Sequence, residues 1–223
     1  MNLREWMPIY RNICSMLAID HKDDFLSSVK LSSLLGDRPS EIPGNFYFRE
    51  VSIFGPAAIK YEMSSWKGDL TIVSDSALGQ FLQLNQGSAP DIIVTDLDGS
   101  QEDVARCCEN GTMTFVHAHG DNVRRIMKAV PSLKGDVIGT TQNYPLHNVF
   151  NFYGFTDGDR SAFISVMLKA SRVRFFGFDF RKPQEKLGTD MQVKKLKLEI
   201  AESLVKIAEK LAIENGSLGF VFC

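Results

Sequence analysis

The sequence contains no long apolar run, no large excess of charge and only four cysteines. None of its hydrophobic segments approaches the roughly 20 residues of a membrane-spanning helix, and no secretory signal pattern opens the chain. The formal net charge of -2 offers no electrostatic basis for nonspecific binding to nucleic acid. The cysteines form no C-x-x-C pair, so we expect a reduced, cytoplasmic protein with neither membranes nor nucleic acids as partners.

The sequence also lacks internal repeats and low-complexity tracts, which indicates an ordinary globular fold. Its 223 residues fit one large domain, or one domain with a small extension. Hydrophobic residues make up 44% of the chain and charged residues 23%, so the protein can bury a sizeable core.

Residues 1–45 are predicted to form a helical segment ahead of the main domain. Trp6, Tyr10 and Ile13 recur at the three- and four-residue spacing of one helix face. A second apolar group predicts another helix, which ends at Gly36. We interpret the apolar stripe as core, although it also permits a homodimer. The second helix is indicated by Phe25, Leu26, Val29, Leu34 and Leu35.

From residue 46 onward, short apolar runs typical of strands alternate with helical patterns. The alternation predicts an α/β domain over residues 46–223, with a mostly parallel, Rossmann-like sheet flanked by helices. The last helix is predicted to begin near Thr189 and to end at Gly216. The predicted strands span residues 51–54, 70–73, 92–94, 113–116, 135–138, 149–153, 174–178 and 218–222.

The stretch from Pro90 to Ser100 reads P-D-I-I-V-T-D-L-D-G-S and joins a buried strand to an acidic turn. Residues two apart on an extended chain point the same way, so we expect Asp96 and Asp98 to project together from the strand's carboxyl end. Parallel sheets bind ligands at that end. Two unpaired carboxylates repel one another, and Mg²⁺ would relieve the repulsion. The alternative is an ordinary turn, in which the carboxylates accept backbone hydrogen bonds.

Acidic residues also follow other predicted strands, and separate helix caps explain the whole set less well than a shared metal does. Mg²⁺ prefers a few carboxylates together with phosphate oxygens, so we predict a metal-dependent site for nucleotide phosphates. The acids are Asp75, Asp96, Asp98, Asp121, Asp157, Asp159 and Asp179. Basic residues can offset phosphate charge, although the lysines among them also fit a solvated helix face. These residues are Arg160, Lys186, Lys194 and Lys195.

Two weaker signals accompany the acids. Gly55-Pro56 follows the first strand, and N–H groups beyond such a turn can receive phosphate, although one glycine also fits a plain tight turn. His117 and His119 in H-x-H-x-D allow a zinc site of the metallo-β-lactamase type. That motif continues with another histidine where this chain has Asn122, so nitrogen ligands are too scarce for two zinc ions. The histidines then fit a polar lining that binds substrate.

Four motifs resemble the archaeal 6-hydroxymethyl-7,8-dihydropterin pyrophosphokinase family, called MptE-like. They occur in family order, and the resemblance covers essentially the whole chain. A more distant resemblance, to the catalytic domain of thiamine pyrophosphokinases, is carried by residues 75–77, 90–100 and 156–157. The four motifs are T-D-L-D-G at 95–99, H-A-H-G-D-N at 117–122, G-T-T-Q at 139–142 and G-F-T-D-G-D-R at 154–160.

The resemblance implies transfer of pyrophosphate from ATP to the hydroxymethyl group of a reduced pterin, with release of AMP. In this interpretation Mg²⁺ is held by Asp75, Asp96 and Asp98. The catalytic residues are Asp96, Asp98, Asp121 and Asp157. Of these, Asp121 or Asp157 orients or deprotonates the hydroxyl. The nucleotide contacts are Gly55, Pro56 and Asp75. The substrate contacts are His117, His119, Asn122, Thr140, Thr141, Gln142, Asp159 and Arg160.

The chain departs from the family pattern at two places. Its first loop reads I-F-G-P-A at residues 53–57 instead of G-x-G-P-S, and residues 75–77 read D-S-A instead of D-G-A. These changes leave open a different substrate or reduced activity. They also leave open a noncatalytic nucleotide-binding protein, while T-D-L-D fits the metal motif of nucleotide-sugar glycosyltransferases. Release of AMP from ATP in the presence of the pterin separates the three functions.

Overall fold

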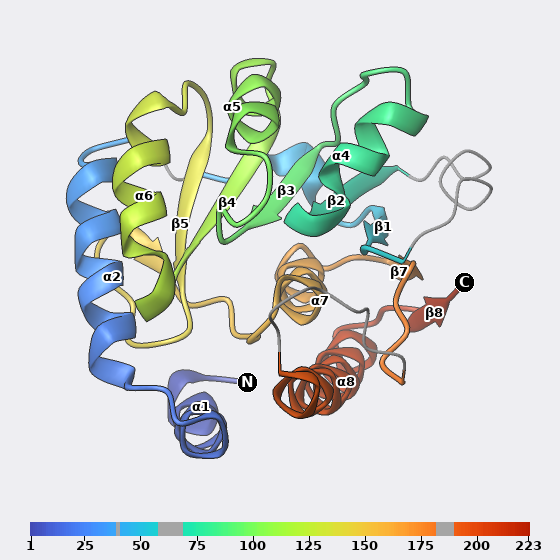
Figure 1. Cartoon of the computed structure of the whole chain (residues 1–223). Coiled ribbons are helices and arrows are strands. Elements are labelled where there is room, and N and C mark those ends of the chain that lie inside the picture. Colours follow the sequence, from blue (N-terminus) through green and yellow to red (C-terminus); the bar gives the residue numbers. More distant parts are fainter. Residues whose placement is uncertain (39–40, 58–68, 182–189) are drawn as a thin grey trace.

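The computed structural model describes residues 1–38, 41–57, 69–181 and 190–223. Within these residues eight strands form one sheet, and each strand runs parallel to its neighbours (Figure 1). The strand order β6-β5-β4-β3-β2-β1-β7-β8 confirms the predicted α/β fold. The strands are β1 Glu50–Phe54, β2 Leu70–Ser74, β3 Ile92–Thr95, β4 Met113–Ala118, β5 Val137–Thr141, β6 Val149–Phe150, β7 Arg172–Phe176 and β8 Phe220–Phe222.

The sheet has an apolar core on each face because side chains alternate along its strands. Ile53 and Ile72 belong to one core, whereas the residues after them, Phe54 and Val73, belong to the other. A parallel sheet that is buried on both faces requires such nearly continuous apolar strands. The short apolar runs in the sequence therefore predicted the sheet correctly.

Helices cover both faces (Figure 1). Helices α1, α7 and α8 pack into the first core, and α2, α4, α5 and α6 pack into the second. No helix in the described part of the chain combines the length and apolarity needed to cross a membrane. The helices are α1 Leu3–Leu17, α2 His21–Leu35, α4 Asp75–Leu84, α5 Gln101–Glu109, α6 Val123–Ala129, α7 Asp157–Met167 and α8 Met191–Glu214. Single 3₁₀ turns are η1 Gly44–Phe46, η2 Gly120–Asn122 and η3 Val130–Ser132.

The first two helices lie on opposite faces of the sheet, although only residues 18–20 separate them. Helix α1 packs Trp6 and Tyr10 into the first core, whereas α2 packs Leu31 and Leu35 into the second. The N-terminal segment therefore wraps around the sheet beside the carboxyl ends of β4 and β5. The division into a helical segment, 1–45, and an α/β domain, 46–223, stays a prediction.

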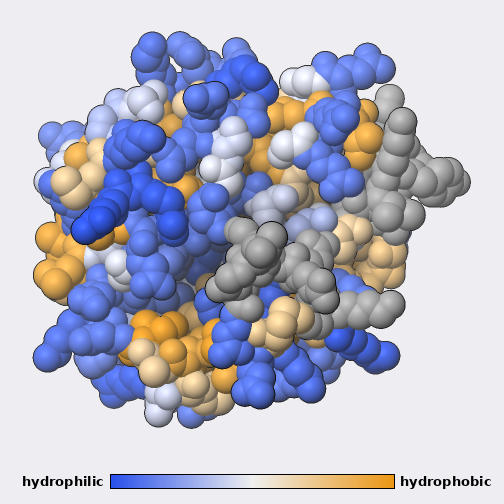
Figure 2. All heavy atoms as spheres, in the orientation of Figure 1, coloured by the Kyte–Doolittle hydropathy of each residue, from blue (hydrophilic) through white to orange (hydrophobic). Residues whose placement is uncertain are grey.

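Helix α2 forms where its apolar residues predicted it, but three of these residues do not face the core. Phe25, Leu26 and Val29 are 38%, 62% and 42% exposed. Apolar surface accordingly lies along the left edge of Figure 2, where Figure 1 places α2. The buried face instead carries serines whose hydroxyls bond to polar partners: Ser28 to Thr141 at 2.8 Å, Ser32 to Asn148 at 2.6 Å and Ser27 to Asn122 at 3.3 Å.

Strands β4 and β5 are longer than predicted. Their pairing continues past the apolar residues, with His117 opposite Thr140 and Ala118 opposite Thr141. The predicted strands end at residues 116 and 138 because polar residues follow there. The paired backbone keeps these polar side chains in the sheet, so His117 and Thr140 point from strands rather than from loops.

Other boundaries also shift. Strand β6 stops at Phe150 instead of residue 153 because the chain turns at Tyr153, which has a φ of 66°. Helix α8 is capped by the Asp190 carboxylate, and Gly216 follows its end with a φ of 90°. Thr189, near which this helix was predicted to begin, lies outside the described residues.

The side of α2 that faces the core differs from the side that its apolar residues predicted, and this difference yields a stability prediction. Leu31 is fully buried, whereas Leu26 on the same helix is 62% exposed. Leu31→Ala should lower the free energy of unfolding by about 2–5 kcal/mol, because it deletes core volume. Leu26→Ala should change it by less than about 0.5 kcal/mol. Urea unfolding of both variants checks this, and equal losses would contradict the assigned face.

Candidate active site

A cavity of about 810 Å³ lies at the carboxyl ends of the parallel strands. Its walls come from the ends of β1, β2, β3, β4, β5 and β7, from the turn between α1 and α2, and from α7 and α8. Open α/β sheets bind ligands at this edge. The predicted site residues that line it are Pro56, Asp96, Asp98, His117, His119, Asp121, Gln142, Asp157 and Arg160.

The D-L-D segment brings Asp96 and Asp98 together, but by a different route from the one predicted. Strand β3 ends at Thr95, and the buried Leu97 adopts a left-handed conformation with a φ of 64°. The Leu97 N–H donates to Thr95 Oγ1 at 2.7 Å, and the Asp98 N–H donates to Asp96 Oδ1 at 3.1 Å. A tight turn, not an extended strand, therefore sets the two carboxylates side by side.

Asp75, the first residue of α4, completes a cluster with these acids. Carboxylate oxygens of Asp75, Asp96 and Asp98 lie within 4.8 Å of one another. Asp75 Oδ2 accepts hydrogen bonds from the Thr95 hydroxyl and the Gly99 N–H. A Cβ at residue 99 would overlap Asp75 Oδ1, so this close approach requires glycine.

The buried Asp75 carboxylate has one oxygen that the described protein leaves unsatisfied. Asp75 is 3% exposed, and its Oδ1 has no hydrogen-bond partner among the described residues. Burial raises the pKa of Asp75, despite its hydrogen bonds from Thr95 and Gly99. An unpartnered carboxylate oxygen beside two further carboxylates fits a divalent cation, because a cation satisfies the oxygen and offsets the repulsion.

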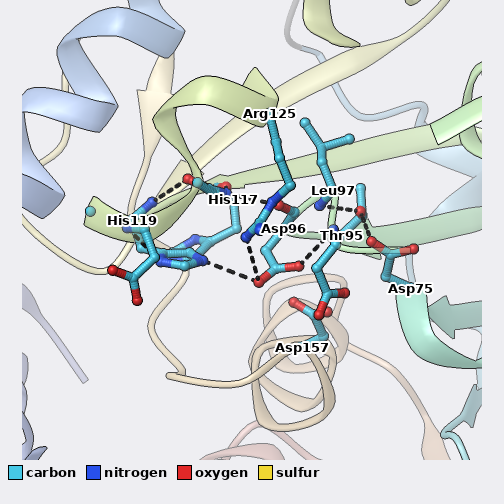
Figure 3. Close-up of polar contacts among 12 residues, drawn as sticks. Asp75, Thr95, Asp96, Leu97, His117, His119, Arg125 and Asp157 are labelled. Atoms are coloured by element: carbon cyan, nitrogen blue, oxygen red, sulfur yellow. Dashed lines mark hydrogen bonds and ion pairs between the residues drawn. The ribbon is translucent and has the colours of Figure 1, made fainter. Parts of the chain in front are cut away.

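Asp96 lies between two basic side chains (Figure 3). His119 Nε2 donates to Asp96 Oδ2 at 3.1 Å, and Arg125 Nη2 lies 4.0 Å from the same oxygen. Burial by itself would raise the pKa of Asp96. The hydrogen bond and charge of His119, with contributions from Asp98 and Arg125, lower it to about 2. Asp96 is therefore ionised at neutral pH.

Asp157 begins α7 and points toward Asp96 from across the cluster (Figure 3). Arg160 Nη1 lies 3.2 Å from Asp157 Oδ1. Burial, together with the negative charges of Asp96, Asp75 and Asp98, raises the pKa of Asp157 well above its usual value even though Arg160 opposes the shift. The site thus places a carboxyl that readily accepts a proton beside three other carboxylates.

His117 forms a buried hydrogen-bond chain with Arg160 and Thr140. Arg160 Nη2 lies 3.0 Å from His117 Nε2, and His117 Nδ1 lies 3.0 Å from Thr140 Oγ1. Arginine can only donate, so Nε2 accepts and Nδ1 carries the proton. Burial, and then the neighbouring positive charge of Arg160, lowers the pKa of His117. The imidazole is neutral and fixed in one tautomer.

Some residues that were predicted to contact the substrate lie behind the cavity wall and support it through hydrogen bonds. The Asn122 amide donates to the carbonyl groups of Asp96 and His117, at 2.9 and 2.7 Å. Asp159 accepts from the backbone N–H and hydroxyl of Thr156, and the two residues form a capping box at the start of α7. These two side chains use their polar atoms within the protein.

Thr140 and Thr141 likewise bond inward. Thr140 Oγ1 contacts His117, and Thr141 Oγ1 accepts from the Ser28 hydroxyl at 2.8 Å and from the Asn143 N–H at 3.1 Å. Neither threonine belongs to the cavity lining. The structure therefore places both residues as supports for side chains that do line the cavity.

In the predicted phosphate loop, the N–H groups of Gly55 and Ala57 donate to backbone carbonyl groups at the end of β7. The Gly55 N–H donates to the Phe176 carbonyl at 2.8 Å, and the Ala57 N–H donates to the Gly177 carbonyl at 3.1 Å. Pro56 has no N–H but lines the cavity. The rest of that loop falls outside the described residues.

The basic residues that were predicted to offset phosphate charge also differ in whether they line the cavity. Lys194 lines the cavity, whereas Lys195 points to Glu199, 3.9 Å away on the surface of α8. Lys186 lies outside the described residues. Asp179 lines the cavity after β7 and, through Oδ1, accepts the Arg181 N–H at 2.9 Å.

Sequence reasoning missed several residues of the site. Arg125 follows the histidine motif by one helical turn, a spacing that could have indicated a cation near the acids. Phe178 was assigned to a strand but lies beyond the end of β7 in the cavity wall. Asp24 and Lys197 gave no local signal, because only the folded chain brings α2 and α8 to the cavity.

This fold and cavity define a doubly wound α/β protein with a cavity at the carboxyl ends of its strands, beside a carboxylate cluster suited to a divalent cation. A family model described as "6-hydroxymethylpterin diphosphokinase MptE-like" matches residues 61–185. The chain belongs to the MptE-like family, which confirms the resemblance seen in its motifs.

Relatives named 6-hydroxymethyl-7,8-dihydropterin pyrophosphokinase match along most of the chain. The protein from Methanocaldococcus jannaschii is 36% identical, with 96% of this chain and 99% of the relative covered. The protein from Methanothermobacter thermautotrophicus is 31% identical, with 94% and 96% covered. The protein from Pyrococcus furiosus is 34% identical, with 81% and 79% covered.

The neutral, buried His117 predicts a pH-dependent loss of stability. An unfolded chain binds a proton at this histidine below a pKa of about 6.5, whereas the native protein resists it. The free energy of unfolding should therefore fall by up to about 1.4 kcal/mol for each pH unit below 6.5. Urea unfolding at pH 7.5, 6.5 and 5.5 should show a smaller fall for His117→Gln.

The exposed His147 provides the matched control. His147→Gln should keep the pH dependence of the unsubstituted protein. The assignment is wrong if His117→Gln and His147→Gln lose stability in parallel as the pH falls.

Proposed function

We propose that this protein transfers the pyrophosphoryl group of ATP to the hydroxymethyl oxygen of 6-hydroxymethyl-7,8-dihydropterin and releases AMP. The hydroxyl oxygen attacks the β-phosphorus and loses its proton. The bond between the β-phosphorus and the oxygen that bridges it to the α-phosphorus breaks, and AMP leaves with that oxygen. The observation that carries the proposal is the cluster of Asp75, Asp96 and Asp98 within 4.8 Å, in a cavity of a chain that belongs to this family.

Mg²⁺ is the proposed cofactor, held by Asp75, Asp96 and Asp98. Bound there, it would neutralise charge on the phosphates during transfer. The protein's own contribution is to keep the carboxylates together: the tight turn positions two of them, and Gly99 lets the third approach. Positioning and charge neutralisation are the main sources of catalysis in phosphoryl transfer.

The nucleotide fits the β1–β7 side of the cavity. Lys194 and Lys197 of α8 line the cavity and can attract the phosphates. Phe178 and Phe180, whose ring centroids lie 6.2 Å apart, supply apolar surface for an aromatic base. The pterin then occupies the opposite side, at the ends of β4 and β5, where His119 and Gln142 line the cavity.

Asp157 is the better placed of the two predicted bases. It faces the carboxylate cluster, whereas Asp121 is exposed on η2 and its N–H donates to His119 Nδ1 at 3.3 Å. A carboxyl that accepts a proton readily, held next to the reacting phosphates, can orient and deprotonate the substrate hydroxyl. We therefore assign this role to Asp157.

The first test measures AMP release from ATP with Mg²⁺ and the reduced pterin. Asp98→Asn should lower kcat/KM by about a hundredfold or more, because it removes one carboxylate of the cluster. Asp37→Asn, at an exposed acid of the segment after α2, is the matched control and should leave the rate unchanged.

The two outcomes are distinct. Full Mg²⁺-dependent AMP release by Asp98→Asn would overturn the metal assignment alone. No AMP release by the unsubstituted protein would overturn the proposed activity, whereas pterin-independent sugar transfer from a nucleotide sugar would indicate the glycosyltransferase alternative.

A second test separates the two candidate bases. Asp157→Asn should reduce kcat by about 10²–10⁴-fold, as expected when a general base is lost. Asp121→Asn should reduce it by less than about threefold, since that side chain is exposed on η2. Steady-state rates at saturating ATP and pterin check this. A larger loss in Asp121→Asn would reverse the assignment.

A further inference from the structure

Gln142, at the end of β5, lines the cavity on the side proposed for the pterin, and its side chain is held in one orientation. Its side-chain Nε2 donates to Asp24 Oδ2 at 2.6 Å, and its backbone carbonyl accepts from Trp6 Nε1 at 2.8 Å. Gln142 is 3% exposed, so both ends of the residue are locked. An ionised carboxylate only accepts, which forces the amide nitrogen toward Asp24 and the amide oxygen away from it.

The Gln142 amide oxygen has no donor in the described protein. Its Oε1 is buried without a hydrogen-bond partner among the described residues. The nearby His117 directs its Nδ1 to Thr140 and its Nε2 to Arg160. A buried acceptor that receives no hydrogen bond costs free energy, and an N–H group of a ligand would supply that bond.

Asp24 holds this arrangement from helix α2. It is 1% exposed and accepts three hydrogen bonds: Tyr10 Oη at 2.7 Å, Gln142 Nε2 at 2.6 Å and the Gly120 N–H at 2.8 Å. These donors come from α1, the end of β5 and the end of β4. Asp24 has no acceptor oxygen left without a donor, so it acts through Gln142 as a positioning residue.

A series of neighbouring contacts connects Gln142 to the acids. Gly120, which donates to Asp24, adjoins His119, and His119 bonds to Asp96. Gln142 therefore lies beyond the histidines from the carboxylate cluster. A pterin has its hydroxymethyl group at one end of the bicyclic ring and the N–H donors of its amino-pyrimidinone at the other.

We infer that Gln142 Oε1 accepts a hydrogen bond from the amino-pyrimidinone N–H edge of the pterin, and that Asp24 fixes its orientation. The inference rests on the proposed function and deepens it. It gives the N-terminal helices a role in substrate selection, because α2 decides whether the cavity offers an acceptor or a donor.

The test uses two variants that alter this acceptor in different ways. Gln142→Met keeps the approximate length but removes the amide. Asp24→Asn replaces one acceptor oxygen with an N–H₂ group, so residue 24 can no longer accept all three hydrogen bonds and no longer fixes the Gln142 amide in one orientation. Both variants should raise the KM for the pterin by about tenfold to a hundredfold, with the KM for ATP unchanged.

Tyr10→Phe is the matched control. It removes a hydrogen bond from the same Asp24 oxygen but leaves Gln142 its acceptor, so the KM for the pterin should stay within about twofold. Quenching of 6-hydroxymethylpterin fluorescence measures binding without turnover and should weaken only in Gln142→Met and Asp24→Asn. Circular dichroism verifies folding; if Asp24→Asn does not fold, Gln142→Met carries the test alone.

The failures can be distinguished. An unsubstituted protein that releases no AMP with ATP and the pterin would overturn the proposed function and this inference together. An active protein whose variants keep the pterin KM would overturn the inference alone. So would variants that raise the KM for ATP and for the pterin equally, or a Tyr10→Phe variant that loses pterin affinity to the same extent.

Discussion

Repulsion between like charges around the end of β3 is the constraint on which the site depends. Asp75, Asp96, Asp98 and Asp157 come from three segments of the chain. Burial raises the pKa values of Asp75 and Asp157, and the negative charge of Asp96 raises both further. The protein offsets only part of this repulsion with basic groups such as His119. The remaining negative charge is the feature that suits the cavity to a divalent cation, and with it to phosphates, as in the proposed function.

The parts of this arrangement that could be predicted from the sequence are those set locally. An apolar run followed by T-D-L-D-G indicates a buried strand with acids at its end, and the parallel sheet brings such ends to one edge. The prediction placed Asp96 and Asp98 together although the reason it used was wrong. Leu97 turns the chain, and no periodicity in the sequence reveals a left-handed leucine.

The parts that could not be predicted depend on contacts between distant segments. Helix α2 was identified by its apolar residues, but its buried face combines leucines with serines, because Thr141 and Asn148, more than 100 residues away, bond to those serines. Asp24 and Gln142 are separated by 118 residues and bond through the wrapping of the N-terminal segment around the sheet. A pattern of hydrophobicity cannot show which polar residues will find partners.

The two ends of the sheet also follow from features of the fold. An outermost strand leaves N–H and C=O groups open, and another sheet can pair with them. Here β6 contains two residues and β8 contains three, so each offers little backbone to pair with. Beside β6, the Asn148 amide donates to the carbonyl groups of Ser32 and Gly36 and so holds α2 next to this edge of the sheet. The N-terminal wrap thus also protects the molecule from edge-to-edge association into larger β-aggregates.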